Sequence, residues 1–389
     1  MQSISARFCP PSPCAERRLR GGRFCALLLA LVLLLTLTAC SGYNAFAIAV
    51  FIPTNDEAPN LAESVEQGIA LALSEINSRE GIHGKAIDIH FYPCVSEREE
   101  AVKTFTRVID SFSPVVVFAA GEPARHIAPQ AEKQSIPLIG LSVENESFTA
   151  GKQWIFRNSL TYEEECRAIL DTAISLQFHE LIILHSGGFE EREFIAHLEK
   201  RAAQENISMR LTEQVCTPED GGYAAIAANR YAQAILFLDT SDRLLLRLAH
   251  CRDLNYRGTI LARSALFDRT LHGMYPAVNV YSSALVIYKR HFGSAKRVFD
   301  IFQVQYGKEM CITSAFAYDT LIMLSKILHS GRINREAVRS ALEAEFVYPS
   351  SFGIRFSRAG ERDFVPRLYP VLLAPDGSVE YLEGELDDD

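Results

Sequence analysis

The sequence lacks a membrane-spanning apolar run, a basic cluster in its body and a dense set of cysteine pairs. Its longest apolar run, residues 24–37, is shorter than the ~20 residues that a transmembrane helix needs. The net charge is -9, and no Lys/Arg-rich run follows the N-terminal segment. Phosphate backbones require a clustered basic face, so these features exclude nucleic acid as a partner.

Motifs of common catalytic sites are also missing. The chain contains no GxSxG elbow, no GxxxxGK[ST] phosphate loop, no GxGxxG fingerprint and no HExxH zinc helix, and its ten histidines have no metal-ligand spacing. His185 and Ser186 are adjacent on an expected strand, so their side chains point in opposite directions and cannot act as base and nucleophile. We therefore expect neither an enzyme nor a protein with a bound metal or cofactor.

The N-terminal segment is present and informative. Four arginines between residues 17 and 23 precede the apolar run 24–37, and the sequence LTAC ends at Cys40. This pattern predicts a signal peptide over residues 1–39. LTAC resembles the bacterial lipoprotein box, which implies that Cys40 is lipidated and becomes the mature N-terminus. The alternative is a plain signal peptide or a signal anchor in which Cys40 has no role.

Cysteine usage sets a limit on cross-linking. Of nine cysteines, five follow Cys40, and they are far apart with no CxxC spacing. An odd number cannot all pair, although an oxidising compartment would permit one or two bridges. The sequence leaves the pairing open.

Residues 46–91 form the unit on which the mature chain is built. Residues 46–52 are uninterrupted apolar, as expected of a parallel strand covered on both faces. Residues 60–78 place apolar side chains at helical intervals, and residues 87–91 alternate as a second strand. Four strands and three helices alternate in this way before residue 144, and a second series runs over residues 163–287. Helices of this length between strands predict parallel sheets. The expected fold class is α/β, with two doubly wound lobes.

Three segments carry a resemblance that spans nearly the whole mature chain, in order: EQGIALALSEINSREGIHGKAIDI from Glu66, FRNSLT from Phe156 and YGKEMCITSAFAYDTLIML from Tyr306. They resemble the type I solute-binding proteins of bacterial ABC importers, specifically the branched-chain amino-acid (Leu/Ile/Val) family. The resemblance implies two lobes joined by three hinge crossovers that close over a ligand. It places residues 40–157 and 288–346 in an N-terminal lobe, and residues 158–287 and 347–389 in a C-terminal lobe.

Candidate ligand contacts follow from position in the fold. Open α/β sheets bind ligands beyond the carboxyl ends of their strands. The residues selected in these loops are Glu122, Ala124, Ser142, Glu144, Phe189, Asp239, Arg263 and Ser264.

An α-amino acid needs donors for its carboxylate and an acceptor for its ammonium, because an unpaired buried charge costs several kcal/mol. The resemblance implies a Gly-Ser-Ser type loop, a small-residue and Thr pair, an aromatic, and an acid from the second lobe. Here Glu122 replaces an expected serine, Phe189 lies near the expected aromatic, and Arg263 lies near the expected acid. A rearranged site remains open, with Ser142 as a hydroxyl donor. Its charged candidates are Glu122, Glu144 or Asp239 for an ammonium and Arg125 or Arg263 for a carboxylate.

These features predict a monomeric, extracytoplasmic solute-binding lipoprotein, anchored to a bacterial membrane. It would deliver a small polar solute, an amino acid or an amide-like compound, to the membrane subunits of an ABC permease. One alternative is a sensory or regulatory lipoprotein that uses the same closure to signal to a membrane partner. Another is a structural or surface-interaction lipoprotein whose cleft has lost ligand binding.

Overall fold

A computed structural model describes residues 46–54, 59–216, 220–239, 241–264, 280–284, 293–329, 333–344, 348–349, 355–359, 363–365, 368–374 and 379–381. The predicted signal peptide and Cys40 lie outside the described residues. None of the described helices has the length and apolar character to cross a membrane.

The first sheet begins with five parallel strands in the order β2-β1-β3-β4-β5. Their bounds are β1 (Phe46–Pro53), β2 (Ile87–Cys94), β3 (Val116–Ala120), β4 (Leu138–Leu141) and β5 (Ile155–Asn158). The chain later returns with β11 (Tyr348–Pro349), β12 (Arg355–Ala359) and β13 (Asp363–Val365). Strand β13 pairs in parallel with β5, and β12 and β11 continue the sheet antiparallel.

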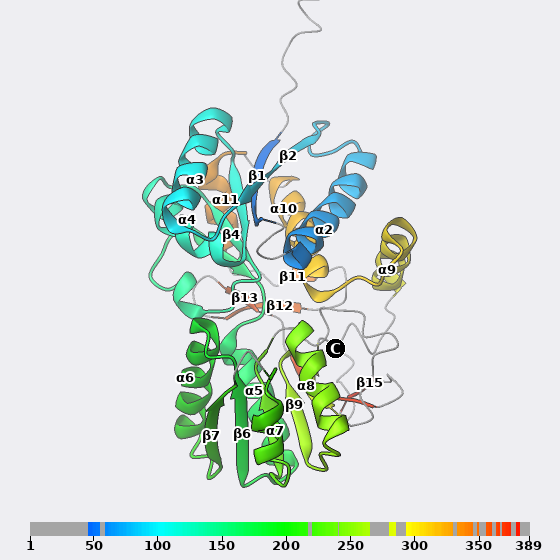
Figure 1. Ribbon diagram of the computed structural model, residues 1–389. Helices are drawn as coiled ribbons and strands as arrows, with labels where there is room; N and C mark the ends of the chain where they lie inside the picture. The colour runs from blue at the N-terminus through cyan, green and yellow to red at the C-terminus, as the bar shows by residue number, and fades with distance from the viewer. Residues whose placement is uncertain are drawn as a thin grey trace, which may run out of the picture. The chain divides into compact units, whose positions relative to one another are not determined.

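Helices cover both faces of this sheet (Figure 1). The helices associated with it are α2 (Pro59–Ser78), α3 (Arg98–Phe112), α4 (Gly121–Lys133), α9 (Gly293–Tyr306), α10 (Ile312–His329) and α11 (Arg335–Glu343); a 3₁₀ turn spans Glu146–Phe148. Because side chains alternate along a strand, β1 sends Ile48 and Val50 toward α2 and α10, and Ala49 and Phe51 toward α3 and α4. This is the two-layer covering that the apolar run of β1 predicts.

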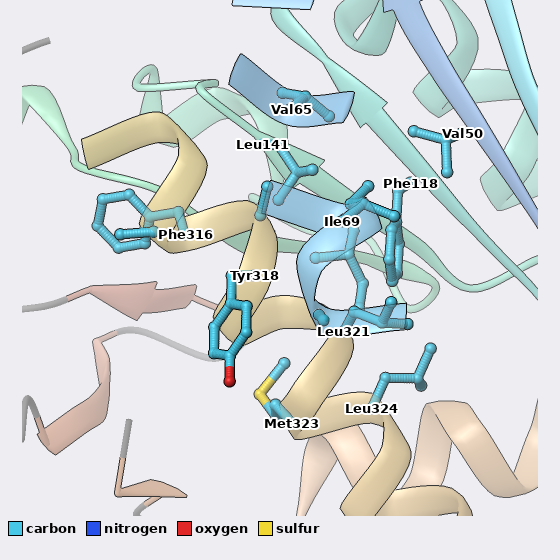
Figure 2. Close-up of a cluster of buried hydrophobic side chains, with 14 of the residues drawn as sticks. Val50, Val65, Ile69, Phe118, Leu141, Phe316, Tyr318, Leu321, Met323 and Leu324 are labelled. Carbon is cyan, nitrogen blue, oxygen red and sulfur yellow. The ribbon is translucent and has the colours of Figure 1, made fainter. Parts of the chain in front are cut away.

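Helices α2 and α10 pack so closely that their contact needs a glycine. A Cβ atom added to Gly68 of α2 would lie 2.2 Å from the carbonyl oxygen of Ser314 on α10. Figure 2 shows the buried side chains beneath this contact, with Val65 and Ile69 from α2 and Leu321 from α10.

The second sheet repeats the first, with parallel strands in the order β7-β6-β8-β9-β10. Their bounds are β6 (Glu180–His185), β7 (Arg210–Val215), β8 (Ala234–Phe237), β9 (Thr259–Ala262) and β10 (Val280–Ala284). Antiparallel strands β14 (Tyr369–Leu373) and β15 (Val379–Tyr381) extend the β10 edge. Helices α5 (Tyr162–Ser175) and α6 (Phe189–Gln204) share one core, and α7 (Tyr223–Ala228) and α8 (Ser241–Asp253) share the other.

The predicted fold class, α/β with two doubly wound lobes, is confirmed. One part of the predicted lobe assignment is wrong: residues 347–389 do not all join the second lobe, because β12 and β13 pair within the first sheet and only β14 and β15 join the second. Without this return of the chain the first sheet would end in an unpaired edge at β5, and β13 pairs with that edge. The remaining lobe boundaries stay a prediction.

Candidate functional site: an arginine and two carboxylates at the strand ends

In both sheets the second strand lies on one side of the first strand and the later strands lie on the other side. The strand order therefore reverses between β1 and β3 in the first sheet, and between β6 and β8 in the second. In open α/β sheets, ligands bind outside the carboxyl ends of the strands near this reversal. The candidate site is therefore built from the loops that follow the strands of the two sheets.

These loops contact one another through polar side chains. Arg125 of α4 lies 3.3 Å from Glu190 of α6, measured from Nη1 to Oε1. Asn145, which follows β4, donates from Nδ2 to Glu193 Oε2 at 3.2 Å. A third pair joins His197 Nε2 to Glu146 Oε2 at 3.3 Å. One face of α6 thus contacts the loop that follows β4.

The central feature is a group that we call the Arg263 cluster, formed by Arg263, Glu144, Glu165 and Ser264. Arg263 follows β9 and donates from Nε to Glu165 Oε2 at 2.9 Å, while its Nη2 donates to both Glu165 and Glu144. The backbone N–H of Ser264 donates to the other oxygen of Glu165 at 2.9 Å, and the Ser264 hydroxyl bonds the same oxygen. Glu144 follows β4, so the cluster connects the two sheets' loops.

Burial and aromatic rings hold the guanidinium in place. The Arg263 side chain is 8% exposed and that of Glu165 is fully buried. The guanidinium carbon lies 4.6 Å from the ring centre of Phe194 and 5.4 Å from that of Tyr162, within the range of a cation–π contact. Burial alone would lower the pKa of Arg263. The negative charges of Glu144 and Glu165 raise it by more than burial lowers it, so the pKa stands well above its ordinary value.

Glu144 is the accessible carboxylate of the cluster, with 28% of its side chain exposed. Burial raises the pKa of its carboxyl to about 7, and the charges of Glu165 and Glu190 add to the rise while Arg263 opposes it. Burial also raises the pKa of Tyr162, and Glu144 adds to that rise. Burial is the main cause of both shifts, and the neighbouring carboxylates add to it.

Two atoms of the Arg263 cluster remain open to a ligand. Among the described residues, no atom bonds Nη1 of Arg263 or Oε1 of Glu144. An open guanidinium nitrogen beside an open carboxylate oxygen offers one donor group and one acceptor. This arrangement complements a solute that carries both a carboxylate or carbonyl and an amine.

The other predicted contacts occupy different surroundings. Ser142 has a left-handed backbone (φ 52) and its hydroxyl lies 3.3 Å from that of Thr313 on α10. Phe189 is 55% exposed, with Arg125 5.2 Å from its ring centre and 3.1 Å from Glu122. The structure therefore brings Glu122 and Phe189 together through Arg125.

Two predicted contacts have side chains directed into the protein. Ala124 is fully buried in the core between α3, α4 and the first sheet. Asp239 is buried against Arg247 of α8, with Nη2 2.8 Å from Oδ1. Neither side chain is exposed to a ligand in this arrangement.

Glu165 is the residue that the sequence analysis missed. It lies on the buried face of α5 with Tyr162 and Ile169, at spacings of three and four residues. A carboxylate on an apolar helical stripe is rarely buried without a partner, and this was the available signal. Among the described residues, no group of three His, Cys, Asp or Glu side chains is arranged to hold a metal ion.

A hollow of about 610 Å³ lies elsewhere in the second sheet, at the amino ends of β8 and β9. The strand order, however, favours the carboxyl ends of the strands for the ligand of this fold. We therefore assign the candidate site to the Arg263 cluster.

Comparison with known proteins agrees with this architecture. The family described as Periplasmic binding protein matches residues 46–372. No match was found among curated proteins. Among solved structures, the chain is similar to the branched-chain amino-acid transporter substrate-binding protein LivJ from Streptococcus pneumoniae, in complex with isoleucine. The TM-score is 0.73 at 16% identity, over 87% of this chain and 98% of that one.

Two further structures have the same fold. The leucine-binding protein LivK from Thermotoga maritima has a TM-score of 0.72 at 17% identity, over 87% of this chain and 98% of that one. An ABC-transporter solute-binding protein from R. palustris, in complex with benzoate, has a TM-score of 0.75 at 15% identity, over 87% and 96%. The family match covers most of the sequence, and the chain belongs to the periplasmic binding protein family.

Proposed function

We propose that the protein is an extracytoplasmic, non-enzymatic solute-binding lipoprotein that captures a small polar solute for an ABC importer. The observation that carries the proposal is the contact between Glu144, in a loop of the first sheet, and Arg263, in a loop of the second. The two side chains lie at the strand ends where this fold binds ligands, and each keeps an open atom. The three similar structures are a transporter substrate-binding protein with isoleucine, a leucine-binding protein and a solute-binding protein with benzoate, which supports the solute class.

The charges of the site support an amino acid or an amide-like solute bound in a particular orientation. Glu144 is positioned to accept from an ammonium or amide N–H, and Nη1 of Arg263 is positioned to donate to a carboxylate or carbonyl oxygen. The acid then comes from the first lobe and the guanidinium from the second. This polarity is the reverse of the one implied by the family resemblance, in which the second lobe supplies the acid.

The surrounding residues have proposed roles as well. Ser142 supplies a hydroxyl beside Thr313, and Phe189 with Glu122 and Arg125 forms an outer wall of the site. Ser264 acts through Glu165 to hold Arg263. Ala124 and Asp239 are buried and contact other groups of the protein in place of the solute.

The remaining parts of the proposal rest on the sequence. Cys40 after the apolar run 24–37 supports a lipid anchor on the outer side of a bacterial membrane. We propose a monomer whose partners are the solute, the permease subunits and the membrane. Intact mass measurement of the membrane-extracted protein tests the anchor: a diacylglyceryl adduct on Cys40 is expected, and an unmodified chain that still carries residues 1–39 would contradict it.

Isothermal titration of the mature protein against a panel of amino acids, their amides and benzoate tests the solute class. A ligand at 100 times its dissociation constant would also stabilise the fold by about 2.7 kcal/mol. Glu144→Gln removes the accepting charge, and loss of a charged hydrogen bond predicts an affinity at least about tenfold lower for an amine solute. Glu100→Gln, an exposed change on α3, is the matched control and should leave affinity unchanged.

The pH dependence sharpens this test. An ammonium favours the charged form of Glu144, whose pKa is raised to about 7, so affinity for an amine solute should fall as pH drops below 7. The Glu144→Gln variant should lose this dependence. Absence of binding across the whole panel, or equal affinities for wild type and Glu144→Gln, would overturn the proposed site.

A further inference from the structure

A hollow in the described structure lies at the amino ends of β8 and β9, away from the strand ends that carry Arg263. Its volume of about 610 Å³ is within the ~300–1,000 Å³ range of small-molecule sites. Phe178, Leu254 and Ala232 give it apolar walls, and Gln233 contributes an amide.

Two guanidinium groups line this hollow without a balancing carboxylate. Arg230 and Arg257 are both exposed lining residues, and the lining contains no Asp or Glu. Among the described residues, neither arginine forms an ion pair. The nearby Arg252, by contrast, lies 3.0 Å from Asp253. On a chain of net charge -9, the hollow is a local concentration of positive charge.

One of the two guanidiniums contacts an aromatic side chain of the same hollow. The Arg230 guanidinium carbon lies 4.5 Å from the ring centre of Tyr231, and its Nη2 bonds the Tyr231 hydroxyl. Tyr231 itself is 85% exposed, which leaves a large aromatic surface beside the cation. A cation beside an aromatic surface favours an anion that has a flat or apolar body.

The floor of the hollow is rigid. The buried Tyr256 donates from its hydroxyl to the carbonyl oxygen of Ala232 at 3.0 Å. A Cβ atom on Gly258 would lie 2.2 Å from that hydroxyl and 2.4 Å from the Ala232 oxygen, so the backbones meet as closely as they can. The hollow is therefore formed before any ligand arrives, which reduces the entropy lost on binding.

We propose that this amino-end hollow is a second binding site, for a solute that carries a phosphate or carboxylate group on a small apolar body. Arg230 and Arg257 bind the anion, because guanidiniums match the oxygen geometry of both groups. Tyr231, Phe178 and Leu254 contact the apolar body. The proposal is independent of the solute bound at Arg263.

Isothermal titration with phenyl phosphate tests the proposal on the mature protein. Wild type should show saturable binding that weakens as NaCl is raised from 50 to 500 mM, since the arginines are exposed. The double variant Arg230→Gln, Arg257→Gln should bind at least about tenfold more weakly, the loss of roughly one charged hydrogen bond. Arg252→Gln is the matched control, because it removes a neighbouring arginine outside the lining, and it should bind like wild type.

Further arms separate the alternatives. Phenol, which lacks the anion, should not bind saturably, and Glu144→Gln should bind phenyl phosphate as wild type does. Titration with monomeric dihexanoyl phosphatidylglycerol, which has an anionic headgroup, tests a lipid as the source of the phosphate. Dihexanoyl phosphatidylcholine, which has a zwitterionic headgroup, is the comparison. Binding of the phosphatidylglycerol without binding of phenyl phosphate would overturn the solute assignment. No saturable binding of phenyl phosphate, or equal binding by the double variant, would overturn the site.

Discussion

Two arginine–carboxylate groups follow neighbouring strands of the second sheet, and they are built differently. After β8, Asp239 pairs with Arg247. Nη2 of Arg247 donates a hydrogen bond to Oδ1 of Asp239 at 2.8 Å. Nε lies 2.6 Å from Oδ2 in an ion pair that lacks hydrogen-bond geometry. The Ser186 hydroxyl donates to Asp239 at 2.7 Å, and Arg247 also bonds Cys216. We call these four residues the Arg247 cluster.

The Arg247 cluster is closed and neutral. Its two charged side chains are 3% and 0% exposed, and each nitrogen of the guanidinium lies against Asp239, Ser186 or Cys216. The Arg263 cluster has two carboxylates for one guanidinium, 28% exposure at Glu144 and an Nη1 that no described residue bonds. Similar residues after adjacent strands therefore serve different purposes: charge balance and enclosure indicate support of the fold, while excess charge and open atoms indicate a ligand contact.

Breaking the closed cluster should have the largest effect on stability. Asp239→Ala leaves Arg247 buried without its charge partner, which should lower the free energy of unfolding by about 3–5 kcal/mol. Glu144→Ala, the matched change in the open cluster, should cost about 1 kcal/mol or less, because Glu165 still pairs with Arg263. Urea denaturation at pH 7 measures both.

The comparison also predicts how the Asp239 loss can be reversed. Replacing both partners with uncharged residues, as in Asp239→Asn with Arg247→Met, should recover most of the stability, since no unpaired charge remains. If Asp239→Ala and Glu144→Ala were equally destabilising, the distinction between a closed and an open cluster would fail.

The next effect is on the pH dependence of stability. The folded-state pKa of Glu144 is raised from 4.5 to about 7, so the folded protein favours the protonated carboxyl. The stability that this group contributes is full below about pH 4.5 and is lost as pH rises through about 7. Relative to Glu144→Gln, wild type should lose on the order of 1–3 kcal/mol of its free energy of unfolding as pH rises through this window. This range is smaller than the full pKa shift would give, because Glu144 is partly exposed.

Thermal or urea unfolding at pH 4.5, 6 and 8, without solute, measures this difference. Glu100→Gln on α3 is again the control, and its stability should follow that of wild type at each pH. A difference between wild type and Glu144→Gln that is constant across the window, or that grows in favour of wild type with rising pH, would contradict the raised pKa.

The two sheets could be predicted from the sequence, but the contrast between these clusters could not. Alternating strands and helices specify the two sheets, because a strand's periodicity and an intervening helix are local features. The short strands β11–β13 were misplaced, because which sheet edge they join depends on an unpaired edge far away in the sequence. The same holds for Asp239: its position after β8 is visible in the sequence, but its pairing with Arg247 depends on how α8 returns to the sheet.

Ala124 is different, because the sequence already contained the signal. It shares a spacing of three, four and seven residues with Ile127, Ala128 and Ala131, and all four side chains are buried on α4. A residue at a loop position is thus better assigned to the core when it continues the apolar stripe of the helix that follows. Glu165, on the apolar stripe of α5, shows the converse: a charged residue there indicates a buried partner.

The smallest expected effects come from the two serines that complete the clusters, and they separate support from positioning. Ser186→Ala removes a hydroxyl that bonds Asp239, and Ser264→Ala removes one that bonds Glu165. Each change should lower the free energy of unfolding by about 1 kcal/mol, because the charged partners stay paired and Ser264 keeps its backbone N–H bond to Glu165.

Only Ser264→Ala should weaken solute binding, by roughly two- to fivefold, a fraction of the ~1.4 kcal/mol that a tenfold change represents. It acts through Glu165 on the orientation of Arg263, whereas the Arg247 cluster has no open atom for a ligand. Titration of both variants with the solute found for wild type measures this, and a weaker affinity in Ser186→Ala of the same size would mean that the two clusters serve the ligand equally.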